Sequence, residues 1–167
     1  MSFQYNADEI LQMAEQIERN GARFYRQASA LVKDEEMVKM LLDFVAWEEG
    51  HERVFASMRK NLTELERQPT VFDPDGETAL YIRAMADGHV FDLRGDRDAL
   101  LTGSETKEEI LRLAIGREKD SIVFYLGLKE MIPQAAGRER IDEIIKEEMN
   151  HIGFLNKEIA ASHHKVK

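Results

Sequence analysis

Apolar residues recur three or four positions apart in four stretches of this chain, which is the spacing of one face of an α-helix. The stretches cover residues 10–31, 41–58, 110–126 and 141–159. The sequence holds only three prolines and is rich in Glu, Leu, Ala, Lys and Arg, a composition that favours helices. The pattern therefore predicts an all-α protein with four long helices.

Three of the predicted helices begin at recognisable capping residues. Asn6 and Thr106 each stand three positions before a glutamate, Glu9 and Glu109, as in a capping box. Asp34 follows a short break and is expected to cap the second helix. Because this break is so short, the first two helices should be antiparallel neighbours.

The stretch between the second and third helices lacks this regularity. Prolines and glycines interrupt residues 62–105, leaving room only for short helical turns near 77–87 and 96–101. The polar tail over residues 162–167 is expected to be frayed. We therefore expect one domain over residues 1–167, made of a helix hairpin at about 7–61, a long crossover at about 62–105 and a second hairpin at about 106–161.

Charge and composition exclude several classes of function. The net charge is −9 with no basic stretch, which argues against nucleic acid and anionic membranes as partners. The absence of cysteine excludes disulfides, thiolate catalysis, cysteine-bound zinc and iron–sulfur clusters. Neither a secretory signal nor a membrane-spanning apolar run is visible, so we expect a cytoplasmic protein.

The sequence also repeats itself at an offset of 100 residues, without a gap. The repeated positions are capping, acidic, aromatic and histidine residues. The matched pairs are Asn6 and Thr106, Glu18 and Glu118, Phe24-Tyr25 and Phe124-Tyr125, Glu48 and Glu148, and His51 and His151. The repeat predicts one helix hairpin present twice, with an approximate two-fold axis relating the copies in a four-helix bundle.

Six of the repeated residues are polar yet fall on the apolar stripes. Glu48 and His51 form a Glu-x-x-His motif, which alone is weak evidence, because one member of such a pair can face solvent beside the stripe. Its copy at Glu148 and His151, together with the two lone glutamates of the first and third helices, changes this interpretation. Four carboxylates and two imidazoles then point at one bundle interior.

Such an interior is costly without cations. A buried ion loses hydration at a cost of several kcal/mol, and the stripes carry no Arg or Lys at neighbouring inward positions. Two divalent ions would neutralise four carboxylates, and oxygen-rich coordination with one imidazole per ion suits iron or manganese better than structural zinc. Protonated, hydrogen-bonded carboxyl groups remain the alternative.

At these residues the sequence resembles the ferritin-like di-iron carboxylate proteins, and most closely the di-iron domain of rubrerythrin. The resemblance covers residues 7–31, 35–61 and 106–160. It implies a ferritin-like four-helix bundle that binds two iron ions per chain, with manganese or zinc as substitutes. It also implies roles for the ligands: terminal for Glu18 and Glu118, bridging for Glu48 and Glu148, and one iron each for His51 and His151.

Two departures from rubrerythrin bear on function. Rubrerythrins carry a second glutamate one turn after the third-helix ligand, where this chain has Ser121, so its six-ligand set is closer to the symmetric bacterioferritin type. Rubrerythrins also carry a cysteine-bound rubredoxin module, and this chain has no cysteine. We therefore expect electrons from a separate protein such as a rubredoxin, and by the same resemblance a homodimer.

Some residues near the motifs have two interpretations. Tyr25 and Tyr125 each lie one heptad after a lone glutamate, and either hydrogen-bond the ligating carboxylates or serve as core aromatics. Trp47 is expected in the core or at a helix contact. Glu147 falls off the inward stripe and is expected at the surface or just outside the ligands.

Three functions follow from these observations. The resemblance favours a di-iron oxidoreductase that reduces hydrogen peroxide, or reacts with dioxygen, using electrons from a donor protein. The second function is iron handling, in which the centre oxidises Fe(II) for storage or transfer. The third is not enzymatic: a redox-silent, metal-stabilised bundle that acts as an interaction module or sensor.

Overall fold

The computed structural model describes residues 6–68, 80, 101–132 and 134–164. Its elements are α1 (Ala7–Leu31), α2 (Glu35–Lys60), α4 (Lys107–Met131), the short 3₁₀ helix η1 (Gln134–Ala136) and α5 (Arg138–His164). No β-strand occurs among these residues, so the all-α prediction is confirmed. None of the helices in this part of the chain is long and apolar enough to cross a membrane.

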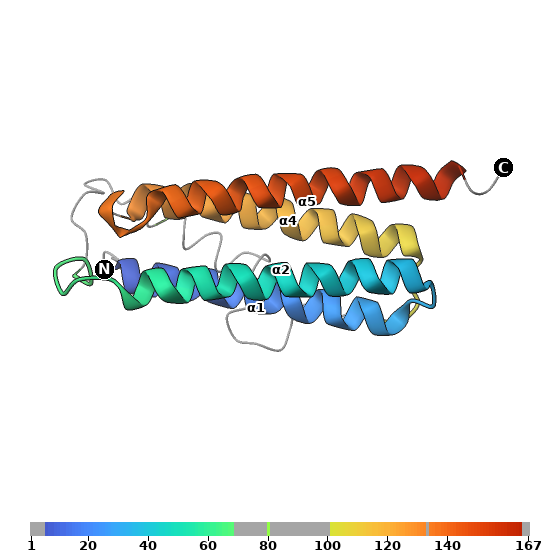
Figure 1. The fold of residues 1–167 in the computed structure, drawn as a ribbon, viewed down its shortest axis with the longest axis horizontal. Coiled ribbons are helices and arrows are strands. Elements are labelled where there is room, and N and C mark those ends of the chain that lie inside the picture. The colour runs from blue at the N-terminus through green and yellow to red at the C-terminus, as the bar shows by residue number, and fades with distance from the viewer. Residues whose placement is uncertain (1–5, 69–79, 81–100, 133, 165–167) are drawn as a thin grey trace.

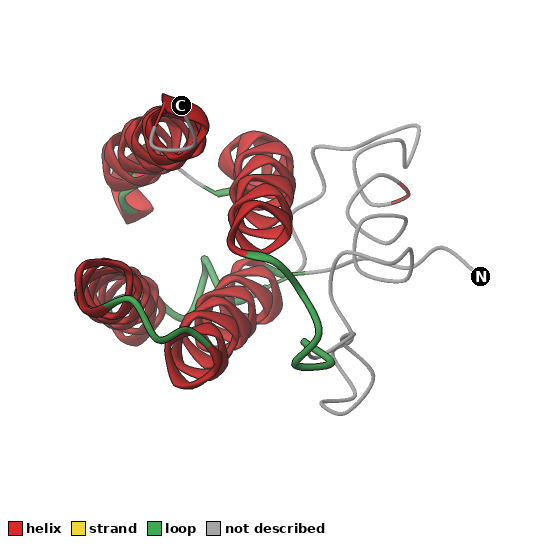
Figure 2. Ribbon diagram, turned by 90° about the vertical axis from the view of Figure 1, so that its right-hand side faces the viewer, coloured by secondary structure: helices red, strands yellow, loops and turns green. Residues whose placement is uncertain are grey.

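The four long helices form two antiparallel hairpins (Figure 1). Close contacts join α1 to α2 and α4 to α5, and α1 to α4 between the hairpins. Because α2 and α4 run in the same direction, the end of α2 and the start of α4 lie at opposite ends of the bundle (Figure 1). Seen end-on, the helices occupy the corners of a bundle (Figure 2), which confirms the predicted pair of hairpins.

The predicted capping residues start the helices. The Asn6 side chain accepts a hydrogen bond from the Glu9 backbone N–H, and the Glu9 side chain accepts one from the Asn6 N–H. Thr106 and Glu109 repeat this capping box at the start of α4. Asp34 caps α2 by accepting from the backbone N–H of residue 37 at 2.8 Å. These local bonds satisfy backbone donors that a helix start leaves unpaired.

The prediction of a frayed tail is wrong for residues 162–164, because α5 continues through His164. Ser162 donates to the carbonyl of Ile159 at 2.7 Å, and His163 Nε2 lies 2.8 Å from the Glu108 carboxylate in the first turn of α4. These contacts hold the last turn. The short turns predicted near 77–87 and 96–101 lie outside the described residues, apart from residues 80 and 101.

The core consists of two apolar clusters at different heights in the bundle. The first includes Ile10, Phe55, Tyr125 and Ile141, and the second includes Tyr25, Phe44, Leu111 and Leu155. On each long helix, one or two buried acidic or histidine residues stand between the residues of the two clusters: Glu18 on α1, Glu48 and His51 on α2, Glu118 on α4, and Glu148 and His151 on α5. The fold therefore places a polar layer in the middle of an apolar bundle.

Candidate metal centre

The six polar residues predicted from the repeat are all buried and come from all four long helices. Glu148 is the most buried, with 0% exposure, and His151 the least, with 7%. Burial of charged side chains to this degree is rare unless they are paired or bind a metal. The structure brings all six to one layer, as two groups that meet at Glu148.

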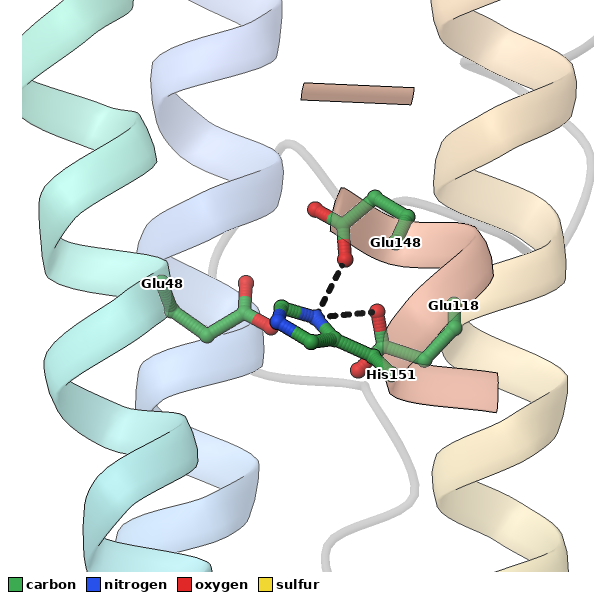
Figure 3. Close-up of side chains that lie close together, drawn as sticks. All are labelled: Glu48, Glu118, Glu148 and His151. Atoms are coloured by element: carbon green, nitrogen blue, oxygen red, sulfur yellow. Dashed lines mark hydrogen bonds and ion pairs between the residues drawn. The ribbon is translucent and has the colours of Figure 1, made fainter. Parts of the chain in front are cut away.

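The first group contains Glu48, Glu118, Glu148 and His151, whose potential ligand atoms all lie within 4.8 Å of one another. Figure 3 shows these side chains converging from α2, α4 and α5. His151 Nδ1 lies 2.8 Å from Glu148 Oε2 and 3.6 Å from Glu118 Oε2. Three oxygens and one nitrogen therefore surround one small volume.

The second group contains Glu18, His51 and Glu148. His51 Nδ1 lies 2.9 Å from Glu148 Oε1 and 3.6 Å from Glu18 Oε2. Glu148 thus presents one oxygen to each histidine, and each histidine faces the lone glutamate of its own hairpin. This arrangement reflects the repeat, because Glu18 and His51 of the second group correspond to Glu118 and His151 of the first group, 100 positions later. Glu48 belongs only to the first group.

Three buried atoms of the second group have no hydrogen-bond partner: Glu18 Oε2, His51 Nδ1 and Glu148 Oε1. The last two are close to each other, yet they are not aligned as donor and acceptor. A buried polar atom without a partner costs roughly 1–3 kcal/mol. A cation between these atoms would satisfy all three, so the donor set fits a divalent metal ion.

The charge of the layer supports the same interpretation. In the described part of the chain, Glu18, Glu118 and Glu148 form ion pairs with His51 and His151, and no ion pair joins any of the four carboxylates to Arg or Lys. The buried Glu15, one turn from the layer, shows the contrast, because Arg19 and Arg59 lie 2.8 Å and 3.3 Å from its carboxylate. Among the buried carboxylates of the described residues, only those of the central layer lack an Arg or Lys partner.

The pKa values of three carboxyl groups in the layer shift in different directions, depending on their neighbours: those of Glu48 and Glu118 rise, and that of Glu148 falls. Burial, and then repulsion from Glu18, Glu118 and Glu148, raises the pKa of Glu48 well above its usual range. Burial is also the main cause that raises the pKa of Glu118 to about 8. For Glu148, burial acts in the same direction, but contacts with Glu118, His151 and His51 outweigh it and lower the pKa. The metal-free layer therefore keeps Glu148 ionised between two histidines.

Both histidines are positively charged imidazolium groups at neutral pH in the metal-free protein. Burial lowers the pKa of His51, but its contacts with Glu148 and Glu18 prevail and raise the pKa to about 11. The pKa of His151 rises to about 9, because Glu118 and Glu148 outweigh burial in the same way. These protons would have to leave before either imidazole could bind a metal.

Each tyrosine of the repeat donates a hydrogen bond to the lone glutamate of the other hairpin. Tyr25 donates to Glu118 Oε1, and Tyr125 donates to Glu18 Oε1. Burial, followed by the nearby carboxylates, raises the pKa of both phenols well above the usual value, so they remain donors. Of the two interpretations offered by the sequence, the hydrogen-bonding one describes the contacts found here, although both rings also pack in the core.

Replacing Tyr25 with phenylalanine should weaken the site through Glu118. The variant leaves a buried oxygen without its donor, which costs roughly 1–3 kcal/mol of unfolding free energy. Loss of such an orienting partner also lowers metal affinity by roughly 10-fold or more. Denaturant unfolding of the metal-free protein and calorimetric metal titration measure the two effects. Ile10→Val is the control, because it removes buried methylene volume far from the layer and should lower stability alone.

The structure also shows the contacts of three further residues around the layer, of which only Gly21 was not considered in the sequence. Of the two places expected for Trp47, the helix contact is the one found: the side chain is 42% exposed, and its ring stacks on His151 across α2 and α5. Glu147 is exposed but contacts His51. Gly21 faces Glu48 so closely that a Cβ there would lie 2.5 Å from Glu48 Oε2. The offset of 100 residues pairs Trp47 with Glu147, and this difference between the copies was the available signal.

Comparison with known proteins identifies the type of fold. Neither a protein-family model nor a curated protein sequence matches the chain. A crystal structure of a candidate ferritin-like diiron-carboxylate protein from Thermotoga maritima is similar to it, with a TM-score of 0.69 and 24% identity. The alignment covers 97% of this chain and 99% of that one. The chain therefore has the ferritin-like fold, a four-helix bundle built from two hairpins that contributes buried carboxylates and histidines from every long helix.

Proposed function

We propose that this protein is a di-iron oxidoreductase of the rubrerythrin type that reduces hydrogen peroxide. The observation that carries the proposal is the pair of carboxylate–histidine groups that share Glu148 and leave buried ligand atoms without partners. The description of the Thermotoga maritima protein as a diiron-carboxylate protein supports iron as the metal. The proposed ligands are Glu18, Glu48, His51, Glu118, Glu148 and His151.

The residues of the two groups suggest the division of ligands. We assign Glu18 and His51 to one ion, and Glu118 and His151 to the other, because each pair lies on one side of Glu148. Glu148 would hold both ions, since its two oxygens face different histidines. We assign Glu48 as the second bridge, because it is the repeat counterpart of Glu148.

The surrounding residues prepare this site for redox chemistry. Two divalent ions would balance the charges of four carboxylates, so the centre would leave no uncompensated charge buried in the apolar bundle. Two bound Fe(II) ions would supply the two electrons that, with two protons, convert one hydrogen peroxide molecule to two water molecules. Tyr25 and Tyr125 hold Glu118 and Glu18 in place, and the two apolar clusters keep bulk water away. We propose a separate protein as the electron donor, since this chain has no cysteine to bind a rubredoxin-type iron.

The test is single-turnover oxidation. Metal-free protein is loaded with Fe(II) without oxygen, and hydrogen peroxide or dioxygen is then added while near-ultraviolet absorption of the oxidised centre is followed. Two irons per chain and much faster oxidation by peroxide would support the proposal. Rapid oxidation by dioxygen with continued iron uptake would favour the iron-handling function instead. Failure to bind Fe(II) would contradict both redox functions.

Metal loading should release protons, and metal affinity should rise with pH. At pH 7 the raised pKa values of about 11, 9 and 8 keep His51, His151 and Glu118 protonated, and Glu48 is shifted in the same direction. Because ligands bind metal in their deprotonated forms, loading at neutral pH should release about three protons or more per chain. Calorimetry in buffers of different ionisation enthalpy measures this number. Release of fewer than about one proton would show that the layer does not bind the metal.

A further inference from the structure

We infer that the two metal positions are unequal although their ligands are repeat copies: the position at His51 fills first and binds more tightly than the position at His151. The difference arises from Glu147 and Trp47, the residues that precede the two proposed bridging glutamates. Glu147 is a positioning residue for His51, and Trp47 covers His151. This inference rests on the proposed di-metal function.

Glu147 acts on the side of the His51 ring that faces away from the layer. Its Oε2 lies 2.7 Å from His51 Nε2, while His51 Nδ1 faces Glu18 and Glu148. A carboxylate at this place accepts a hydrogen bond from Nε2–H and keeps that proton on Nε2, so that the proton lost on metal binding comes from Nδ1 and leaves its lone pair for the metal. Such a partner also orients the ring and increases its basicity as a ligand. His51 is therefore held ready for a metal ion by a residue of the opposite hairpin.

His151 has an aromatic neighbour at the corresponding place. The Trp47 ring stacks on it with centroids 4.8 Å apart and planes at 12°, and Phe44 packs at 5.0 Å. Within the described residues, the carboxylates that pair with His151 are Glu118 and Glu148, and both approach Nδ1. Trp47 restrains the ring by packing but has no acceptor for an imidazole N–H. His151 thus lacks the carboxylate support that Glu147 provides to His51.

The hydrogen bonds of the metal-free layer point to the same order of filling. Within the layer, the three buried ligand atoms without partners all belong to the position at His51. At the other position, His151 Nδ1 already forms a 2.8 Å hydrogen bond with Glu148 Oε2, which a metal ion would have to replace. The first ion therefore satisfies unpaired atoms at His51, whereas the second must break an existing bond at His151.

The expected difference in affinity is roughly 10-fold, at the lower end of the effect of an orienting carboxylate. We choose the lower end because the Glu147 side chain is 57% exposed, and water weakens its interaction with the ring. The unequal positions would let one ion stay bound while the other exchanges beside the half-exposed Trp47.

Trp47 makes the order of filling measurable, because it is the only tryptophan of the chain. Fe(II) is titrated into metal-free protein without oxygen, with binding followed by calorimetry and quenching by tryptophan fluorescence. We expect the first equivalent to bind with little quenching and the second to cause most of it. Crystals of protein loaded with one Fe(II) per chain should show anomalous scattering mainly at the position beside His51.

Glu147→Ala should lower affinity at the His51 position by roughly 10-fold, so that quenching moves toward the first equivalent. Glu147→Gln keeps an acceptor and should restore part of the order. Glu143→Gln is the matched control, because Glu143 lies one turn away on α5, is equally exposed at 55%, and pairs with Arg140 instead of the layer. Metal-free unfolding should be nearly the same for all three variants.

The outcomes separate this inference from the proposed function. If two ions bind but quench equally from the first equivalent, the positions are equal. If Glu147→Ala leaves the order of filling unchanged, Glu147 does not set it. Either result would contradict the inference, while the di-metal site stands. If no Fe(II) binds to the unmodified protein, the di-metal function fails and the inference fails with it.

Discussion

Glu148→Gln is expected to abolish binding of the metal pair and to destabilise the metal-free protein by about 3 kcal/mol. Glu148 is fully buried and touches both histidines, one with each oxygen. Its contacts help to raise the pKa values of His51 and His151, so both rings are charged at neutral pH. Without this carboxylate, two buried imidazolium groups lose their shared anion. Metal content by mass spectrometry and denaturant unfolding of the metal-free protein measure the two effects.

Glu48→Gln is the matched control for this prediction. Burial and neighbouring carboxylates raise the pKa of Glu48, so its protonated carboxyl group resembles the amide of glutamine. The variant should also bind metal poorly, but its metal-free stability should stay within about 1 kcal/mol of the unmodified protein. Equal destabilisation by both substitutions would show that the charge is not concentrated on Glu148, and would contradict our account of the metal-free layer.

Gly21→Ala is expected to weaken metal binding without destabilising the fold. The new Cβ would lie 2.5 Å from Glu48 Oε2 and 2.8 Å from Glu48 Cδ, so the carboxylate has to move out of the layer. The end of a glutamate side chain moves easily, and alanine favours a helix interior over glycine by about 0.5–1 kcal/mol. The metal-free protein should therefore be as stable as before or more stable, while metal affinity falls by roughly 10-fold or more.

The control for this prediction is Gly116→Ala on α4. Gly116 is also helical, and a Cβ there meets nothing within 4 Å. This variant should gain the same helix stability of about 0.5–1 kcal/mol and keep both metal ions. Thermal unfolding with and without Fe(II) compares the two variants directly. A Gly21→Ala protein with unchanged metal affinity would show that Glu48 does not need its present position to bind metal.

Much of the fold follows from local features of the sequence. The period of the helix determines which residues share a face, so the apolar stripes can be found from spacing alone. The capping boxes at Asn6 and Thr106 likewise depend only on residues three positions apart. The tail after residue 161 was predicted less well, because its last turn is held by a contact between His163 and α4, which no local pattern shows.

The sequence by itself determined which six residues share the interior, because the repeat placed each acid and histidine on an apolar stripe twice. Only the tertiary structure decided how they meet. Glu148 between two histidines, Glu147 on His51 and Trp47 on His151 are all contacts between hairpins, set by how α2 and α5 pack against each other. Helical spacing assigns a residue to a face of its own helix, but it does not say which side chain of another helix lies opposite. That is why the six candidate ligands could be predicted from the pattern, whereas the contacts behind the inferred inequality of the two positions required the fold.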